Sequence, residues 1–105
     1  MRLGAAALLA FCCAAAAPGA EEAPGRAKAQ ACAACHGASG LSTTPDAPHL
    51  AGQPRIYLVQ QLKAFRSGQR VHEVMNVVAK PLSDGDIEAL AEWYSSWVVE
   101  VRERR

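Results

Sequence analysis

The sequence has no surplus of charge of either sign. It contains 11 Lys and Arg against 10 Asp and Glu, a formal net charge of +1, and setting aside Arg2 leaves 10 against 10. A protein that binds nucleic acid through the phosphate backbone presents a basic patch, and no stretch of this chain supplies one. The sequence therefore predicts no nucleic-acid partner.

The chain also lacks an internal repeat, a second domain and the alternation of apolar and polar residues that is typical of strands. Its apolar residues recur instead at the period of helices, so the sequence predicts an all-α fold. Once a leader of roughly 20 residues is set aside, the rest is close to the size at which a hydrophobic core alone is marginal. We therefore expect a disulfide, a metal or a large buried cofactor to support the fold.

The longest apolar run, residues 3–17, is too short and too rich in alanine for a comfortable membrane span of roughly 20 residues. Residues 1–20 carry one early positive charge, Arg2, then an uncharged apolar run and then small residues. This order is typical of a secretory signal peptide, so we expect export to the periplasm, cleavage near the end of this segment, and a single domain over residues 21–105. After cleavage no stable membrane span is expected. The alternative is a leader that stays uncleaved as an N-terminal anchor.

Without that leader the chain has only one pair of cysteines. Cys12 and Cys13 lie in the apolar segment of the leader, which leaves Cys32 and Cys35 in the exported protein. Two cysteines in an oxidising compartment form a disulfide by default. A structural disulfide is therefore one interpretation of the pair.

Three stretches have helical periodicity: residues 25–37, 54–68 and 83–98. Glycines end the first two, and Ser83 is the expected N-cap of the third. The connection over residues 38–53 is long for so small a domain, so we expect it to wrap around something. The apolar residues predicted to lie on the helix faces toward the core are Leu58, Leu62, Phe65, Ile87, Leu90, Ala91, Tyr94, Trp97 and Val98.

The first helical stretch is rich in alanine. Its Ala27, Ala31 and Ala34 share one face, and we expect this face to be the groove that receives Tyr94 and Trp97 of the last helix. The segment between the second and third helical stretches, residues 69–81, is predicted to be irregular.

Residues 32–36 read CAACH. In a helical turn Cys32, Cys35 and His36 project from neighbouring parts of one face. Two thiols at this spacing can add across two vinyl groups on one edge of a porphyrin, while the imidazole reaches the iron. This is the signature of c-type haem attachment, and it predicts one covalently bound haem c.

Other interpretations of these residues explain less. A thioredoxin-like CxxC motif belongs in a βαβ context, which the sequence does not have. A zinc site would need further ligands, and outside the motif only His49 and His72 are available after the leader. A disulfide accounts for the cysteines and leaves His36 unexplained.

A six-coordinate haem needs a second axial ligand from further along the chain. Met75 is the only methionine outside the leader, and its soft thioether suits haem iron. It could instead fill a gap in the core. His72 is the rival ligand because imidazole binds iron more strongly, and His49 ranks last since it is expected to face solvent.

The whole order of features resembles the class I cytochromes c, in particular the small bacterial groups cytochrome c4 and cytochrome c553. The order is a leader, CxxCH, Pro-x-Leu, an amphipathic helix, a lone Met and then LSDGDIEALAEWY. The stretches HLAGQPRIYLVQQLKAFRSGQR and MNVVAKPLSDGDIEALAEWY are similar to this group in spacing as well as composition. The resemblance implies the small all-α cytochrome c fold, in which three to four helices surround one haem and the first and last helices cross.

The resemblance also implies a role for each matching residue. Cys32 and Cys35 would hold the haem covalently, His36 would be the proximal axial ligand and Met75 the distal one. Pro48 matches the proline whose carbonyl accepts a hydrogen bond from the proximal imidazole, which fixes the orientation of the ring. Members of this group often carry two such domains, whereas this sequence contains one.

These expectations describe a one-electron carrier that is not an enzyme, because two filled axial positions leave no coordination site for a substrate. Its partners would be redox proteins such as a dehydrogenase, a cytochrome complex or a terminal oxidase. The alternatives are a haem subunit of a periplasmic dehydrogenase, a small haem peroxidase, or a haem-based gas sensor. Carbon monoxide binding would separate the carrier from proteins with an open iron site.

Overall fold

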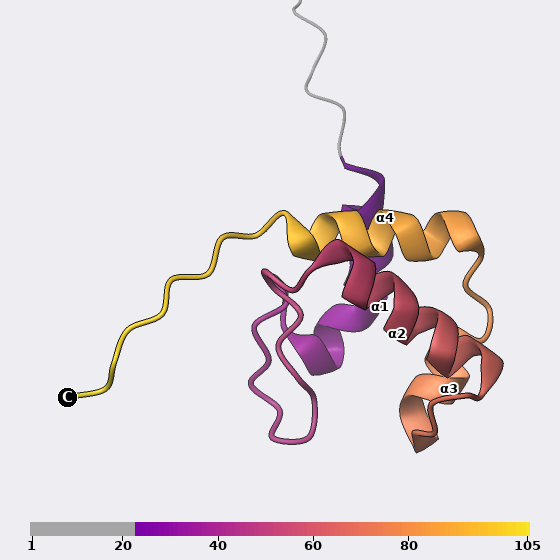
Figure 1. Ribbon diagram of the computed structural model, residues 1–105, viewed down its shortest axis with the longest axis horizontal. Coiled ribbons are helices and arrows are strands. Elements are labelled where there is room, and N and C mark those ends of the chain that lie inside the picture. The colour runs from indigo at the N-terminus through magenta and orange to yellow at the C-terminus, as the bar shows by residue number, and fades with distance from the viewer. Residues whose placement is uncertain (1–22) are drawn as a thin grey trace, which may run out of the picture.

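The structure is a computed structural model that describes residues 23–105, where it contains four helices and no strand. The helices are α1 (Pro24–His36), α2 (Arg55–Ser67), α3 (Glu73–Ala79) and α4 (Asp84–Ser95). Helix α4 packs against α1 and α2, and α3 packs against α2 (Figure 1). The predicted all-α fold is confirmed, whereas the expected leader lies outside the described residues. Within the described range, no helix is long and apolar enough to cross a membrane.

Helices α1 and α4 cross at Gly25. A Cβ atom placed on this glycine would lie only 2.6 Å from Cβ of Trp93 and would also collide with the backbone carbonyl of Ala89. A residue without a side chain is therefore required at the crossing point. One turn further along α1, Ala29 is 4% exposed and continues the contact.

The prediction of which face of the first helix packs against the last helix was wrong. Ala27, Ala31 and Ala34 are all exposed and do not form a groove for the last helix. The buried face runs instead through Gly25 and Ala29 to Cys32 and His36. Periodicity alone could not distinguish the two faces, because both carry small residues in the first two turns of the helix. The close approach of Trp93 and Ala89 at Gly25 decides how the helix is rotated.

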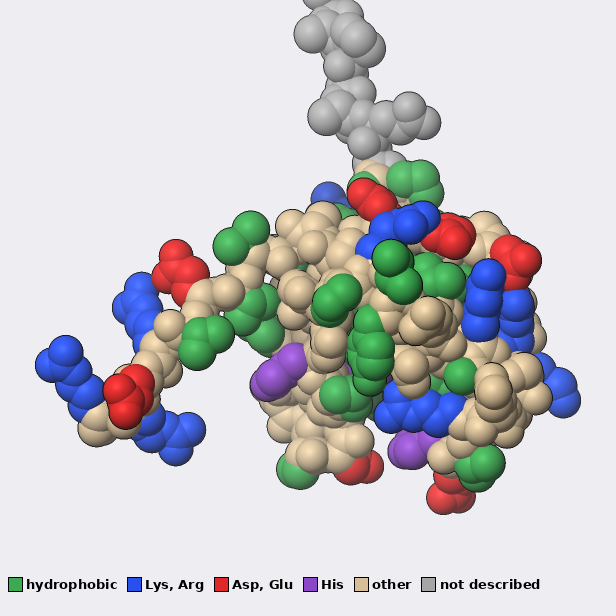
Figure 2. Space-filling model, in the orientation of Figure 1, with side chains coloured by type: hydrophobic (Ala, Val, Ile, Leu, Met, Phe, Trp, Pro, Cys, Tyr) green, Lys and Arg blue, Asp and Glu red, His purple; other side chains and the backbone are tan. Residues whose placement is uncertain are grey.

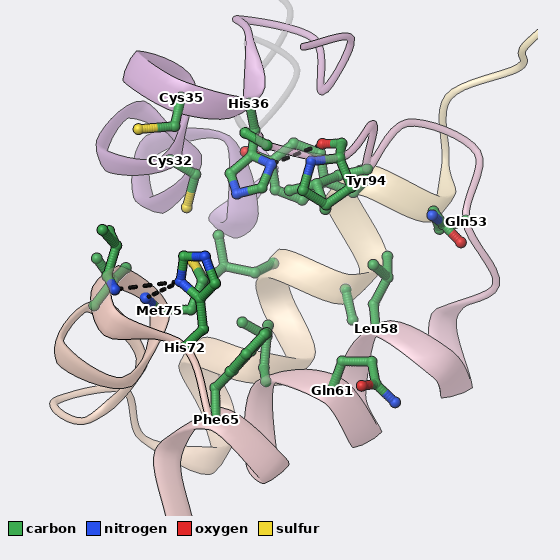
Figure 3. Close-up of a pocket in the computed structure, with 18 of the residues that line it drawn as sticks. Cys32, Cys35, His36, Gln53, Leu58, Gln61, Phe65, His72, Met75 and Tyr94 are labelled. Carbon is green, nitrogen blue, oxygen red and sulfur yellow. Dashed lines mark hydrogen bonds between the residues drawn. The ribbon is translucent and has the colours of Figure 1, made fainter. Parts of the chain in front are cut away.

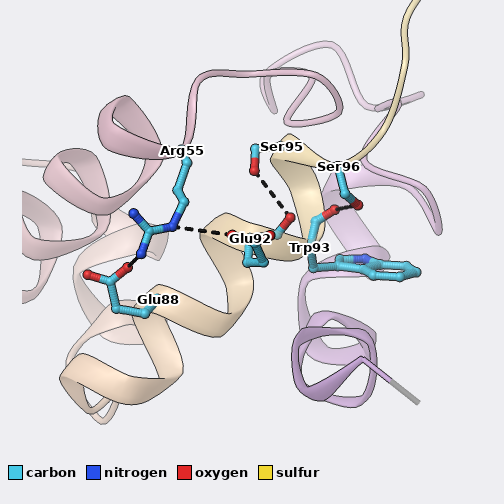
Figure 4. Close-up of polar contacts among 6 residues, drawn as sticks. All are labelled: Arg55, Glu88, Glu92, Trp93, Ser95 and Ser96. Atoms are coloured by element: carbon cyan, nitrogen blue, oxygen red, sulfur yellow. Dashed lines mark hydrogen bonds and ion pairs between the residues drawn. The ribbon is translucent and has the colours of Figure 1, made fainter. Parts of the chain in front are cut away.

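Helix α4 begins as predicted and ends earlier than predicted. The Ser83 hydroxyl accepts a hydrogen bond from the amide of Asp86, whose carboxylate accepts one from the Ser83 amide in return, so the two residues form a capping box. At the other end the Ser95 and Ser96 hydroxyls donate to the carbonyls of Glu92 and Trp93, at 3.2 and 2.6 Å (Figure 4). Serine side chains that bond to nearby backbone carbonyls weaken helix continuation.

The early end of α4 overturns part of the predicted core. Trp97 is 39% exposed and Val98 is 90% exposed, so neither residue belongs to the core. Trp97 instead lies edge-on against Trp93, with ring centroids 5.5 Å apart. Tyr94, by contrast, is 3% exposed, as predicted. Trp97 and Val99 still lie beside Gly52 of the connection, and the last residues of the chain extend away from the four-helix body (Figure 1).

Helix α2 presents the predicted apolar stripe, with Leu58 and Phe65 buried. Its first residue, Arg55, forms an ion pair with both Glu88 and Glu92 of α4 (Figure 4). The segment predicted to be irregular contains α3, which is a correction. This helix has only seven residues, several of them valines, which are poor helix formers, so local composition did not indicate it.

Candidate functional site

The site is an apolar cavity of about 300 Å³ that lies among all four helices and the connection between α1 and α2 (Figure 3). Apolar side chains from α2 and α4 form one wall. The lining residues include Cys32, Cys35 and His36 from α1, Pro48 and Leu50 from the connection, Leu58 and Phe65 from α2, His72, Met75 and Val78 from or beside α3, and Leu90 and Tyr94 from α4. The long connection thus wraps around the cavity, as expected.

Both cysteines of the CAACH motif are free thiols at the cavity. The Cys32 sulfur points toward the cavity, and Cys35 lies at its exposed edge (Figure 3). Burial raises the pKa of the Cys32 thiol, and a hydrogen bond with Tyr94 partly offsets that rise. Burial and the neighbouring thiol raise the pKa of Tyr94 as well. Both groups are therefore neutral at ordinary pH.

His36 is 7% exposed, and its ring orientation is held by Pro48. The Nδ1 atom of His36 lies 2.8 Å from the carbonyl oxygen of Pro48. A carbonyl oxygen can only accept, so Nδ1 carries the hydrogen. The lone pair of the neutral ring therefore remains on Nε2, which is the tautomer that a metal-binding imidazole requires.

The connection that carries Pro48 is closed at its base by Gly40. The Gly40 carbonyl accepts hydrogen bonds from the amides of Leu50 and Ala51, at 2.7 and 3.1 Å. Gly40 has φ = 85°, and a Cβ atom there would lie 2.8 Å from both the Ala51 amide nitrogen and the Tyr94 ring. Glycine at this position lets the loop close tightly and so helps to place the Pro48 carbonyl.

His72 and Met75 lie on the other side of the cavity from His36 (Figure 3). His72 is the N-cap of α3: its Nδ1 accepts hydrogen bonds from the amides of Val74 and Met75, both at 3.2 Å. Since backbone amides can only donate, Nδ1 has no hydrogen and the neutral ring carries its proton on Nε2. His49 is exposed, accepts from the Ser42 amide at 2.8 Å and does not line the cavity.

Two polar residues near the site were missed by the sequence analysis. Asn76 makes three side-chain hydrogen bonds around the start of α3. Arg70 lines the cavity with its guanidinium 4.6 Å from the Phe65 ring centroid, and it donates to the Gln61 side chain at 2.7 Å. For Asn76 the sequence offered one signal, its position four residues after His72, the N-cap of α3. This signal is weak because Asn is also common in irregular loops.

The donor set fits a flat, iron-containing cofactor. Within residues 23–105, no three side chains among His, Cys, Asp and Glu converge as the protein ligands of a bare metal ion would. Two free thiols and one imidazole with an unused Nε2 lone pair instead border a single apolar cavity. This combination would suit a porphyrin that the two thiols could hold through thioethers and whose iron the His36 imidazole could bind.

Comparison with known proteins agrees with this fit. The model of the Cytochrome c family matches residues 22–96. The chain is 46% identical over 69 residues to the thiosulfate dehydrogenase electron acceptor of Thiomonas intermedia, which covers 65% of this chain and 32% of that protein. It is 42% identical over 79 residues to cytochrome c-554(548) of Halomonas halodenitrificans, which covers 72% of this chain and 95% of that one.

A solved structure resembles the chain in three dimensions as well. The reduced recombinant cytochrome c4 from Pseudomonas stutzeri has a TM-score of 0.68 at 37% identity, over 73% of this chain and 45% of that one. The chain thus spans about a third of the acceptor protein and less than half of cytochrome c4. Because the family match covers more than half of the sequence, the chain belongs to the cytochrome c family, whose cofactor is a covalently bound haem c.

Proposed function

We propose that this protein is an exported single-haem electron carrier in which Cys32 and Cys35 hold the haem and His36 and Met75 are its axial ligands. The observation that carries the proposal is the hydrogen bond from His36 Nδ1 to the Pro48 carbonyl, which leaves the Nε2 lone pair free at the cavity. The haem supplies an iron that alternates between the ferrous and ferric states. The protein positions the ligands and excludes water.

The choice of Met75 over His72 rests on the hydrogen bonds of His72. To offer a lone pair on Nε2, His72 would have to move its proton to Nδ1 and give up both backbone amides that it caps. The thioether of Met75 needs no such rearrangement, because it carries no proton and makes no competing bond. A thioether ligand also favours the ferrous state and so raises the reduction potential.

The surroundings of the cavity suit electron transfer without substrate chemistry. Buried Leu58, Phe65 and Leu90 form much of its wall, and an apolar wall lowers the local dielectric and keeps water from the iron. With His36 and Met75 as axial ligands, no coordination position is left for a substrate or for peroxide. We therefore propose a carrier and not an enzyme.

The surface beside Met75 supports brief contacts with redox partners. Val71, Val74, Val77 and Val78 are 86%, 51%, 72% and 38% exposed on and just before α3. Positive and negative side chains are interspersed on the face of the four-helix body that Figure 2 shows, and the formal net charge is only +1, so we do not expect a strongly steered encounter. Small apolar contacts of this kind suit transient electron-transfer complexes.

The donor that we propose is a periplasmic dehydrogenase, and the acceptor a cytochrome complex or terminal oxidase. A relative that shares 46% identity over its matched region is named as the electron acceptor of a thiosulfate dehydrogenase. A solved thiosulfate dehydrogenase (TsdBA) from Marichromatium purpuratum matches 70% of this chain at 38% identity, and this match supports a second candidate, in which the chain is a permanent haem subunit of such a dehydrogenase. Purification at native expression level distinguishes the two, since a carrier separates from the dehydrogenase and a subunit remains bound.

Stopped-flow reduction and reoxidation of the purified holoprotein test the carrier proposal. We expect rapid exchange with a shallow dependence on ionic strength once the Debye length falls to about 10 Å near 0.1 M salt. Ferrous protein should not bind carbon monoxide at neutral pH. Peroxide turnover at rates that rival electron exchange would contradict the proposal, and so would ready carbon monoxide binding.

A further inference from the structure

Helix α3, which carries Met75, is too short to be stable by itself. It spans seven residues, Glu73–Ala79, and only Ala79 among them is buried. Isolated helices shorter than about 12 residues are marginal in water even when their composition is favourable. The side chains that hold α3 in place therefore decide where the Met75 backbone lies.

His72 holds the start of this helix. Its Nδ1 accepts from the amides of Val74 and Met75 at 3.2 Å each, so one of the two capped amides belongs to Met75 itself. The imidazole ring also meets the Phe65 ring edge-on, with centroids 6.3 Å apart. The cap thus fixes the backbone of Met75 against the cavity wall formed by α2.

Asn76 ties the same turn to the end of α2. Its Oδ1 accepts from the His72 amide at 2.7 Å, and its Nδ2 donates to the carbonyls of Phe65 and Arg70, each at 2.8 Å. These bonds use both hydrogens of the side-chain amide and one lone pair of its oxygen. His72 and Asn76 therefore support each other on the two sides of Met75, and we name this pair the α3 clamp.

We infer that the α3 clamp is a positioning device that keeps the Met75 sulfur at the iron. The inference rests on the proposal that Met75 is the distal ligand. It assigns His72 a role through its Nδ1 hydrogen bonds and not as a ligand. Loosening the clamp should let the sulfur leave more often, while the fold around α1, α2 and α4 is retained.

The test compares His72→Ala, which removes the acceptor, with His72→Asp, which restores an acceptor of the type favoured at N-caps. Asn76→Ala removes the other half of the clamp. His49→Ala is the matched control, because His49 also accepts a backbone amide through Nδ1 but lies away from Met75. Each ferric holoprotein is titrated with imidazole while the near-red sulfur-to-iron band is followed. Amide exchange at Val74 and Met75 is measured by NMR on the same samples.

Loss of an N-cap changes the equilibrium between the formed and the opened first turn of a helix by about fivefold. We expect His72→Ala to lose half of the near-red band at about fivefold less imidazole than the wild type and to exchange the Val74 and Met75 amides about fivefold faster. His72→Asp should recover both values, His49→Ala should match the wild type, and Asn76→Ala should lose the band at least as readily as His72→Ala.

The readouts separate this inference from the proposed function. If the wild type has the band, and His72→Ala loses half of it at the same imidazole concentration, the clamp is overturned while Met75 remains the proposed ligand. A His72→Asp variant that behaves like His72→Ala also overturns it. A wild type without the band removes Met75 as the ligand and the clamp's function with it. If Asn76→Ala does not fold, the His72 series still decides the question.

Discussion

The two sides of the cavity are supported in different ways: one side carries His36 and the other carries Met75. The His36 side is built on the crossing of α1 and α4, where buried Gly25 and Ala29 bring the two backbones together. The Met75 side is built on a short, mostly exposed helix held by polar side chains. Close packing resists local opening, whereas exposed hydrogen bonds open at low cost. The proximal side should therefore be the rigid one and the distal side the adjustable one.

The two histidines at this cavity show how a backbone partner decides the use of an imidazole. His36 donates from Nδ1 to a carbonyl and keeps its Nε2 lone pair. His72 accepts at Nδ1 from two amides and therefore carries a proton on Nε2. The same ring keeps a free Nε2 lone pair in one case and caps a helix in the other, so residue type alone does not identify an axial ligand.

The largest effect should come from removing the covalent attachment on the rigid side. Replacing Cys32 and Cys35 with Ala together should abolish haem that stays with the polypeptide through acid-acetone extraction and denaturing electrophoresis, because no thioether can form. Haem staining of the gel measures this. Met75→Ala is the control and should stain like the wild type, since it changes only the distal side. Wild-type haem that extracts freely would contradict covalent attachment.

The second effect concerns the adjustable side. Met75→Ala should lose the near-red band of the ferric protein, lower the reduction potential and open the ferrous iron to carbon monoxide, because the substitution removes the proposed thioether ligand, which favours ferrous iron. Val78→Ala, another cavity-lining substitution on α3, should keep the band. Without added imidazole, His72→Ala should keep it as well. The reverse pattern would make His72 the ligand.

The third effect tests the rigidity of the helix crossing. Gly25→Ala places a methyl group 2.6 Å from Trp93 Cβ and against the carbonyl of Ala89, and overpacking of this kind costs about 1–3 kcal/mol. Gly85→Ala is the matched control, because its Cβ would meet nothing closer than 3.8 Å; there alanine should stabilise α4 by about 0.4–1 kcal/mol. Denaturant unfolding of both holoproteins measures the difference. Equal stabilities would show that the helices do not need to approach so closely.

Much of the rigid side was predictable from the sequence. The CAACH motif, the stop at Gly37, the Ser83 cap and the buried Tyr94 all follow local rules of spacing and capping. The rotation of α1 did not follow, since both candidate faces begin with small residues and the approach of Trp93 to Gly25 selects one of them.

Less of the adjustable side could be read from the sequence. Met75 was singled out as the lone methionine, but the helix that carries it was not predicted. Its stability depends on Asn76 reaching the carbonyls of Phe65 and Arg70, a tertiary contact that has no local pattern. Met75 could therefore be proposed as a ligand from the sequence, whereas helix α3, which carries it, could not be predicted.

The smallest effect concerns the ion pairs that join the first turn of α4 to α1 and to α2. Lys28 of α1 lies 2.5 Å from Asp86, and this contact, with the Ser83 amide, lowers the pKa of Asp86 to about 2. Arg66 of α2 lowers the pKa of Asp84 in the same way. Each carboxylate therefore contributes stability that is fully present above its unfolded pKa of about 4 and is lost as the pH falls through its folded value.

Lys28→Ala should raise the pKa of Asp86 toward its usual value and leave Asp84 unchanged, whereas Arg66→Ala should do the opposite. Carboxyl NMR titration of the two variants measures both groups in one experiment. The loss of stability between about pH 4 and pH 2 should become shallower in Lys28→Ala, because less stability depends on an ionised Asp86. Arg66→Ala should make the loss below about pH 4 shallower for the same reason at Asp84. Exposed pairs contribute little, so the haem spectrum at neutral pH should not change. A Lys28→Ala variant in which the pKa of Asp84 also shifts would show that the two carboxylates in the first turn of α4 do not titrate independently.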